Sequence, residues 1–291
     1  MRFTDIGQQL RAYRLESGLR AEEIAGRLGV SRAALYRYEK GEVIKLDTIQ
    51  RLAELLEISP LSLLGIGVEY YNRTIAFLER QRQIEETADQ LQLLESTLCY
   101  LMTSDAFDAT LAAATAEAAD AAGADRTTHR NSAEQVMGVL ATRKRQHAIR
   151  RPNVICIFSR DRLRWLLASG IAASLPLSPD MRARCRATAR AEIVALEQLL
   201  RAEPMGLQLG LLTSAEPVGT FGLYRARDRA TLTINPFTAD SPTGIAGGVA
   251  IITAADEAIA AHQRVAEAQW RGAVKGPAAA DLLAALLDEP S

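Results

Sequence analysis

Residues 19–41, LRAEEIAGRLGVSRAALYRYEKG, constrain the fold of this chain more than any other segment, because they specify two short helices joined by a tight turn. Ile24, Ala25 and Leu28 fall on one face of the first helix. Gly29 follows them at the position where a left-handed backbone costs least. The segment therefore predicts a compact pair of helices that share one apolar core.

The second helix of the pair has two faces of different chemistry, and Ser31 is placed to cap its beginning. Ala34, Leu35 and Tyr38 have the spacing of a core-facing stripe. The other face carries Arg32, Ala33, Tyr36 and Arg37. A guanidinium can donate two parallel hydrogen bonds to one guanine edge, so two outward arginines on such a helix suit the major groove of DNA.

Around this pair, residues 3–64 resemble the helix-turn-helix of phage lambda repressor and Cro, the Xre-type family. The motifs that carry the resemblance are Gly18-Leu19, Glu23-Ile24-Ala25, Leu28-Gly29-Val30-Ser31 and Tyr38-Glu39-Lys40-Gly41, with apolar Ile6, Leu10 and Leu15 before them and Ile49, Leu52, Ala53, Leu55 and Leu56 after them. Ser59-Pro60 opens a short last helix, and five helices complete the expected domain.

The resemblance assigns roles to individual residues. It places Arg32, Ala33 and Arg37 at base-reading positions and Arg20 and Lys40 at phosphate. It also places Ala21 where the family usually has a glutamine, so that one DNA contact is missing, and it matches Arg14 and Glu39 to a buried ion pair between the first and third helices. The complete predicted DNA-binding set is Arg20, Ala21, Ser31, Arg32, Ala33, Tyr36, Arg37 and Lys40.

The whole chain is too long for one small domain, because domains most often have about 100–150 residues and this chain has 291. Its net charge of −1 is not the global footprint of a non-specific nucleic-acid binder, so we expect any DNA affinity to be local. The odd number of cysteines, three, fits a reducing cytoplasm. No signal peptide and no membrane-length apolar run is found, which predicts a soluble cytoplasmic protein without membrane contact.

Residues 67–149 are predicted to form a helical linker or dimerisation region. Gly65 and Gly67 make a hinge, and from Val68 to at least Thr103 we expect helix without a break. Apolar residues recur here at spacings of three, four and seven, which is typical of a coiled-coil seam: Ile84, Leu91, Leu94, Leu98 and Leu101. An amphipathic helix packed on its own chain explains the pattern equally well. A homodimer is favoured because one domain of this kind binds a half-site weakly.

Residues 150–291 alternate short apolar runs with longer helical patterns. Buried or paired strands are predicted at 153–158, 207–213, 218–224, 231–234 and 248–253, with a hairpin turn at 225–229. Helices are predicted at 105–122, 132–148, 161–168, 179–201, 254–271 and 278–287, and residues 124–131 are expected to be a loop. The expected fold is multidomain: a helix-turn-helix domain (1–66), the helical linker, and an α/β domain with a mixed sheet.

No enzyme signature is present in this sequence. His129, His147 and His262 are the three histidines, and none has a partner at metal-ligand spacing, so neither a metal nor a cofactor is predicted. The glycine-rich segment 244–248 precedes a strand, which indicates a turn and not a phosphate loop. The order of elements faintly resembles sensor domains on the phospholipase-D fold, whose catalytic motif is missing here. We therefore expect binding without catalysis.

Three features outside the helix-turn-helix domain are candidates for a ligand-dependent function. Aromatic and amide side chains near strand ends suit a small-molecule effector, although a core role is the commoner fate of such residues: Trp165, Phe221, Tyr224, Asn235 and Phe237. Cys185 lies among arginines that favour a thiolate, as a redox-sensing thiol that reacts with peroxide requires, unless those arginines face water.

The third feature is a reversal of charge along the chain. Ten acidic residues lie between Glu79 and Asp125, and twelve lysines and arginines lie between Arg143 and Arg190. Such blocks sit on facing surfaces or solvated helix faces more often than they line a ligand site or a DNA patch.

Together these features favour a dimeric, sequence-specific transcription regulator, most simply a repressor, that binds a double-stranded DNA operator and senses a small molecule. Two other classes remain open: an enzyme domain fused to a DNA-targeting module, and an antitoxin-like protein whose C-terminal half grips another protein. A large exposed apolar patch would favour the last of these.

Overall fold

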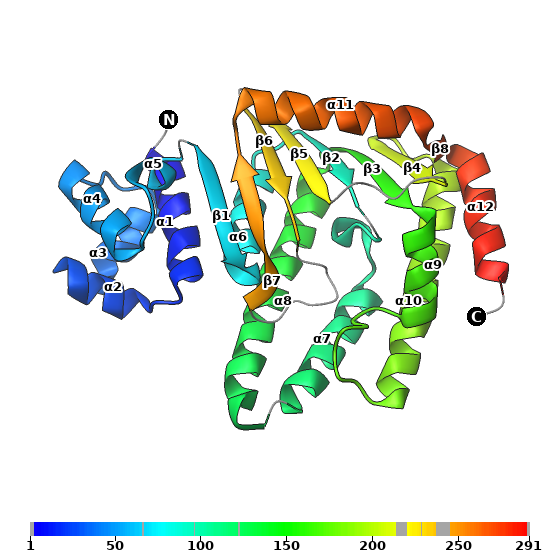
Figure 1. Ribbon diagram of the computed structural model, residues 1–291, viewed down its shortest axis with the longest axis horizontal. Coiled ribbons are helices and arrows are strands. Elements are labelled where there is room, and N and C mark those ends of the chain that lie inside the picture. The colour runs from blue at the N-terminus through cyan, green and yellow to red at the C-terminus, as the bar shows by residue number, and fades with distance from the viewer. Residues whose placement is uncertain are drawn as a thin grey trace.

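The computed structural model describes residues 3–65, 67–95, 97–121, 123–213, 220–227, 229–236 and 245–289. The chain begins with the five expected helices: α1 (Phe3–Ser17), α2 (Ala21–Leu28), α3 (Arg32–Glu39), α4 (Leu46–Leu55) and α5 (Pro60–Leu63). In Figure 1 these helices form a separate group at the N-terminal end of the molecule. α1 is the helix of this group that lies nearest to the rest of the chain.

The rest of the chain forms one layered α/β unit around an eight-stranded sheet. Its strands are β1 (Val68–Arg73), β2 (Gln90–Leu94), β3 (Asn153–Ser159), β4 (Leu207–Leu212), β5 (Phe221–Ala226), β6 (Arg229–Ile234), β7 (Ile245–Thr253) and β8 (Val274–Lys275). Their order across the sheet is β1-β7-β6-β5-β2-β3-β4-β8. β2, β3 and β4 are parallel neighbours, and the other neighbouring pairs are antiparallel, so the sheet is mixed as predicted.

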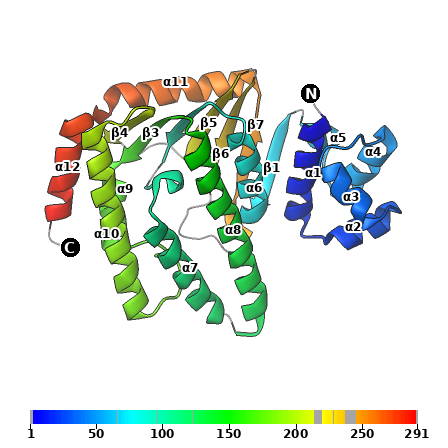
Figure 2. The same ribbon diagram turned by 180° about the vertical axis from the view of Figure 1, so that it is seen from behind.

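Helices cover the two faces of this sheet unequally. One face packs against α6 (Thr74–Glu85), α7 (Asp105–Asp120), α8 (Arg126–Arg150), α9 (Arg160–Ser169), α10 (Pro179–Ala202) and α12 (Gly276–Asp288). The opposite face packs against α11 (Asp256–Gly272), which crosses the strands in Figure 1. Figure 2 shows α8, α7 and α10 extending beyond the sheet on the first side. Two short 3₁₀ turns, Tyr100–Met102 and Gly123–Asp125, complete the described elements.

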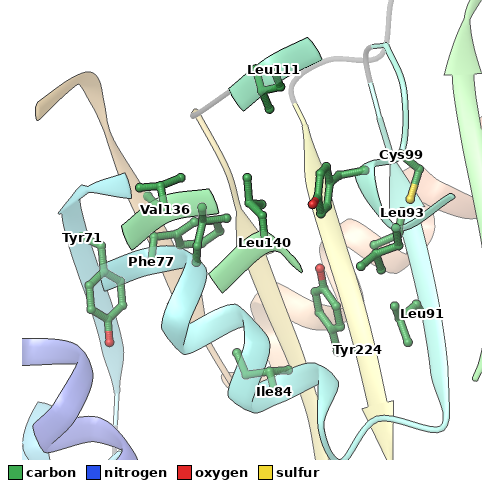
Figure 3. Close-up of a cluster of buried hydrophobic side chains, with 14 of the residues drawn as sticks. Tyr71, Phe77, Ile84, Leu91, Leu93, Cys99, Leu111, Val136, Leu140 and Tyr224 are labelled. Carbon is green, nitrogen blue, oxygen red and sulfur yellow. The ribbon is translucent and has the colours of Figure 1, made fainter. Parts of the chain in front are cut away.

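The larger of the two cores lies between the sheet and the layer of several helices. Phe77 of α6 lies beside Val136 of α8 in this layer, and Leu140 of α8 and Leu91 and Leu93 of β2 belong to the same buried cluster (Figure 3). Each of these side chains is less than a tenth exposed. Full burial of one such apolar side chain stabilises the fold by about 1.5–3 kcal/mol. This core is continuous with that of the five N-terminal helices.

The uninterrupted helix predicted from Val68 to Thr103 is wrong, and the coiled-coil seam is wrong with it. β1 and β2 occupy part of this segment, and Leu91 and Leu94 of the supposed seam lie on β2. Leu91 and Leu94 pack into cores on opposite faces of the sheet. A short leucine-rich strand that is buried on both faces cannot be told from a buried helix by the spacing of its apolar residues. The strands that pair with β2 lie far away in the sequence, so no local pattern indicated a strand here.

Most elements after residue 150 lie where the sequence predicts them. β3, β4, the β5–β6 hairpin, β7 and the four helices α9–α12 agree within a few residues. Two expectations are wrong. Residues 126–131 belong to α8 and are not a loop, and residues 245–248 belong to β7 and are not a turn. Gly248 has a packing role in β7, because a Cβ there would lie 2.8 Å from the Pro236 ring.

Candidate nucleic-acid interface

The turn between α2 and α3 has the local chemistry that its sequence specifies. Gly29 ends α2 in the left-handed region, with φ 71° and ψ 29°. Ser31 precedes α3 in an extended conformation, and its Oγ accepts a hydrogen bond from the Ala34 amide at 3.1 Å. This cap satisfies one of the amides that an α-helix leaves unpaired at its start. The entry of α3 is therefore fixed by two residues.

Apolar contacts hold α3 against the rest of the domain. Leu35 is completely buried, and so is Ile24 on α2. Leu28 is 4% exposed, and its carbonyl accepts a hydrogen bond from Arg51 Nη2 on α4 at 3.0 Å. Because the inner faces of α2 and α3 share one core, the outer face of α3 is presented by a rigid base.

The ion pair between Arg14 and Glu39 is present and bidentate. Arg14 Nε lies 2.6 Å from one Glu39 carboxylate oxygen, and Nη2 donates to the other at 3.0 Å. Gly7 allows α1 to approach the same end of α3, since a Cβ there would lie 2.5 Å from the Tyr38 carbonyl oxygen. These contacts tie the end of α3 to α1, in the structural position that the resemblance implies.

Both arginines of α3 point outward and carry carboxylate partners that sequence reasoning missed. The side chains of Arg32 and Arg37 are 58% and 57% exposed. Arg32 Nη1 lies 2.7 Å from Glu22 Oε1, and Arg37 Nε lies 3.0 Å from Glu42 Oε2. Ion pairs this exposed contribute only ~0–1 kcal/mol. A DNA phosphate or base edge can therefore displace Glu22 and Glu42 at small cost.

Tyr36 shapes the outer face of α3 together with Arg32. Arg32 Nη2 donates to the Tyr36 hydroxyl at 3.2 Å, and the guanidinium carbon lies 5.3 Å from the ring centroid. The hydrogen bond to Tyr36 and the charge of Glu22 raise the pKa of Arg32 above its ordinary value. Arg32 is thus a permanent cation that lies against a half-buried aromatic ring.

The remaining predicted DNA-binding residues are exposed, with one exception. Arg20, Ser31, Ala33 and Lys40 all face solvent, and the Arg20 side chain is 80% exposed. Ala21 is 4% exposed and packs in the domain core, so the prediction that its side chain belongs to the DNA-binding set is wrong.

The rest of the chain leaves this face uncovered. Figures 1 and 2 show α2, α3 and α4 on the side of α1 that is turned away from the sheet. In both views the α/β unit lies behind α1 as seen from α3. Arg32 and Arg37 are therefore open to a duplex, whereas α3 borders the first half of α8 at Tyr36.

A buried polar network, which sequence reasoning also missed, fastens this domain to the α/β unit. Glu69 of β1 is 6% exposed and accepts hydrogen bonds from Gln9 Nε2 at 2.6 Å and from the Tyr71 hydroxyl at 2.7 Å. Arg80 of α6 donates to the same carboxylate at 2.9 and 3.1 Å. Tyr13 of α1 stacks on Tyr71 with ring centroids 5.5 Å apart. The two parts of the molecule are therefore joined by direct packing and not only by the segment at Gly65–Gly67.

The structure does not bring the predicted ligand residues together. Phe221 and Tyr224 are three residues apart on β5 and pack into the cores on opposite faces of the sheet. The Tyr224 hydroxyl accepts a hydrogen bond from Gln81 Nε2 at 2.5 Å, and Phe221 contacts His262 edge-on. Trp165 lies on α9 and is 45% exposed. Asn235 follows β6, and Phe237 lies outside the described residues. The grouping of these residues into one site is wrong.

The hypothesis of a reactive thiolate at Cys185 is also wrong. The residue is 1% exposed on the inner face of α10. Burial raises the pKa of its thiol, and the neighbouring arginines offset this only in part. The charge reversal along the chain does correspond to facing surfaces, because Glu85 pairs with Arg143 at 2.7 Å and Asp108 pairs with Lys144 at 2.7 Å.

Comparison with known proteins supports the geometry of the first domain. A family described as a helix-turn-helix domain matches residues 5–63. The N-terminal domain is a helix-turn-helix domain of the Xre type. A putative HTH-type transcriptional regulatory protein of Pyrococcus horikoshii, PH1808, is 44% identical over 62 residues. That alignment covers 20% of this chain and 20% of the relative. No solved structure matches the chain.

None of the helices in the described ranges is long and apolar enough to cross a membrane. Among the same residues, no group of three or more histidine, cysteine, aspartate or glutamate side chains is placed to hold a metal ion.

Proposed function

We propose that this protein is a dimeric, sequence-specific DNA-binding transcription regulator, in which the helix-turn-helix domain reads an operator and the α/β unit sets its placement. The proposal is supported by the match of residues 5–63 to a helix-turn-helix family. It is also supported by similarity to a putative transcriptional regulatory protein over the same part of the chain. The sequence carries no catalytic signature, so the function we propose is binding and not catalysis.

One observation carries the proposal: α3 presents Arg32 and Arg37 outward while Leu35 anchors it. The two guanidiniums are more than half exposed, whereas Leu35 is fully buried and Ser31 fixes the helix start. A helix anchored in this way can enter the major groove, where each arginine can donate two hydrogen bonds to the O6 and N7 of a guanine. Arg20 precedes α2 and Lys40 follows α3; both are exposed, and in this proposal they contact phosphates.

Pairing of two chains follows from the small size of this reading surface. A single α3 has eight residues and covers one half-site. Two copies related by a twofold axis would contact successive major grooves, about 34 Å apart. Because the Glu69 network packs the helix-turn-helix domain directly on the α/β unit, we propose that contacts between α/β units set the distance between the two copies of α3. Any change in that distance then changes operator affinity.

The experiment that tests this function begins with selecting genomic fragments that bind the purified full chain. The affinity of the selected operator is then measured by fluorescence anisotropy for wild type, Arg37→Ala and Lys40→Ala. We expect Arg37→Ala to cost about 1–3 kcal/mol on the operator and to relax discrimination at one base position. Lys40→Ala should weaken all sequences alike and reduce the salt dependence. Failure to enrich any fragment would refute sequence-specific binding.

A further inference from the structure

A cavity of about 480 Å³ lies where the helix-turn-helix domain meets the α/β unit. Four places in the chain line it: the α1–α2 connection, Tyr36 of α3, the junction of β1 with α6, and the first half of α8. In Figure 2 the lower half of α8 and the end of β1 lie on one side of this junction, and α1 and α2 lie on the other. An occupant of the cavity would therefore touch both parts of the molecule at once.

The lining of this junction cavity combines apolar and polar groups. Leu15, Ile75 and Val136 supply apolar surface, and Val136 is 2% exposed. Ser132 and Gln135 of α8 add a hydroxyl and an amide. Small-molecule sites typically have volumes of ~300–1,000 Å³ and combine apolar walls with a few convergent polar groups. The junction cavity agrees with this description in both size and composition.

The charge of the lining is predominantly positive. Three arginines, Arg14, Arg20 and Arg73, face one carboxylate, that of Glu22. Arg14 is bound to Glu39, and Glu22 is bound to Arg32. Arg20 is largely exposed and lies 3.5 Å from Glu23. The Arg73 guanidinium lies against Gly18, and in the described part of the chain it forms no ion pair within 4 Å. The Glu16 carboxylate accepts hydrogen bonds from the Asn72 and Arg73 backbone amides and offsets part of the Arg73 charge. Arg20 and Arg73 can therefore take an anionic ligand.

A buried hydroxyl in the lining has no partner. Thr74, the first residue of α6, is 3% exposed, and its Oγ1 has no hydrogen-bond partner in the part of the chain that is described. A buried polar atom without a partner costs about 1–3 kcal/mol, so its presence in a folded protein calls for an explanation. Thr74 belongs to the cavity lining, but its Oγ1 is closed off from the cavity, so a polar group of a ligand could reach this hydroxyl only after the side chain rotates.

We propose that the junction cavity binds a small organic anion, a molecule with an apolar body and a carboxylate, phosphate or sulfonate group. The anionic group lies near Arg20 and Arg73, and the apolar body lies against Leu15, Ile75 and Val136. A backbone phosphate of DNA matches this cavity less well, because a single phosphate would leave the apolar walls uncovered. The inference deepens the proposed function by giving the class of the effector, and it rests on that function for its regulatory meaning.

Binding at this place is suited to regulate α3. The occupant contacts Tyr36, which holds Arg32, as well as α8 and α6 of the α/β unit. A ligand that fits one placement of the helix-turn-helix domain better than another shifts the population toward that placement. Operator affinity then changes with ligand concentration.

The probe for this site is 8-anilino-1-naphthalenesulfonate, an organic anion whose fluorescence rises in apolar surroundings. We expect saturable binding of one probe per full-length chain. Gln135→Trp, which fills the cavity, should weaken the probe's affinity at least tenfold, and Arg73→Met should weaken it at least fivefold. Glu134→Trp is the matched control, because Glu134 is an exposed neighbour of Gln135 that does not line the cavity. The affinity of the probe for this variant should stay within twofold of its affinity for wild type. Circular dichroism melting checks that every variant is folded.

Equal probe affinity in wild type and in folded Gln135→Trp would overturn the proposal, and so would the absence of saturable binding. These measurements use no DNA, so they succeed or fail independently of the proposed regulator function. A second experiment measures the dissociation constant of the operator complex with and without saturating probe. The probe should change this constant at least threefold for wild type and should leave it unchanged for Gln135→Trp. A tenfold loss of operator affinity in Gln135→Trp without the probe would show that the cavity takes a DNA phosphate, and would also overturn the proposal.

Discussion

Replacing Glu69 with glutamine tests how the two parts of the molecule are joined. The Glu69 carboxylate accepts four hydrogen bonds, from Gln9, Tyr71 and twice from Arg80, and both members of the ion pair are less than a tenth exposed. Glu69→Gln keeps the shape of the side chain but leaves the Arg80 guanidinium buried without a counter-charge. Breaking a buried pair in this way costs about 3–5 kcal/mol. That is a large fraction of a typical total stability of ~5–15 kcal/mol.

The assay is urea denaturation of the full chain, with hydrogen exchange of α1 as a local readout. We expect Glu69→Gln to lower the free energy of unfolding by about 3–5 kcal/mol and to speed exchange in α1. Arg11→Gln is the matched control, since it removes a half-exposed arginine from the buried Glu79 carboxylate. Arg82 stays 3.0 Å from the same carboxylate, so this change should cost less than about 1 kcal/mol. A loss below about 1 kcal/mol in Glu69→Gln would refute the claim that this network fastens the domain.

Three further predictions concern single residues. Ser31→Ala removes the cap of α3 and should destabilise the helix-turn-helix domain by about 1 kcal/mol, measured as a shift of the urea midpoint, whereas an unchanged midpoint would contradict the capping role. Burial raises the pKa of Glu95 to about 7, so the native state binds more protons than the unfolded state between pH ~4.5 and 7. Stability should fall as pH rises through that window, and Glu95→Gln should abolish the fall; a wild-type profile that stays level there would refute the prediction. Cys185 should react with a thiol reagent at pH 8 only after unfolding, so rapid labelling of the native protein at this residue would contradict its burial.

The helix-turn-helix domain could be predicted from sequence because its determinants are local. Gly29, Ser31 and the spacing of Leu35 from Ile24 and Leu28 lie within a dozen residues of one another, and each acts through backbone conformation or helix periodicity. The outward direction of Arg32 and Arg37 follows from the same periodicity. Their partners Glu22 and Glu42 were missed, although both lie within ten residues of the arginines they bind.

The parts of the fold that the sequence did not predict depend on distant partners. β1 pairs with β7, with Tyr70 opposite Ile251, and no local pattern announces that contact. The aromatic content of β1 was the available signal for a strand. The burial of Cys185 could have been predicted, because it shares a four-residue spacing with buried Ala189 and Ile193 on α10. The junction cavity could not, since its lining comes from residues about 120 positions apart that meet only in the folded chain.

Guanine methylation interference on a selected operator tests the central claim most directly. If α3 enters the major groove with Arg37 outward, methylation at N7 of one guanine in each half-site should block binding of wild type. Arg37→Ala should lose sensitivity at that guanine and keep the rest of the pattern. Identical interference patterns for wild type and Arg37→Ala would contradict the assignment of this face of α3 to base recognition.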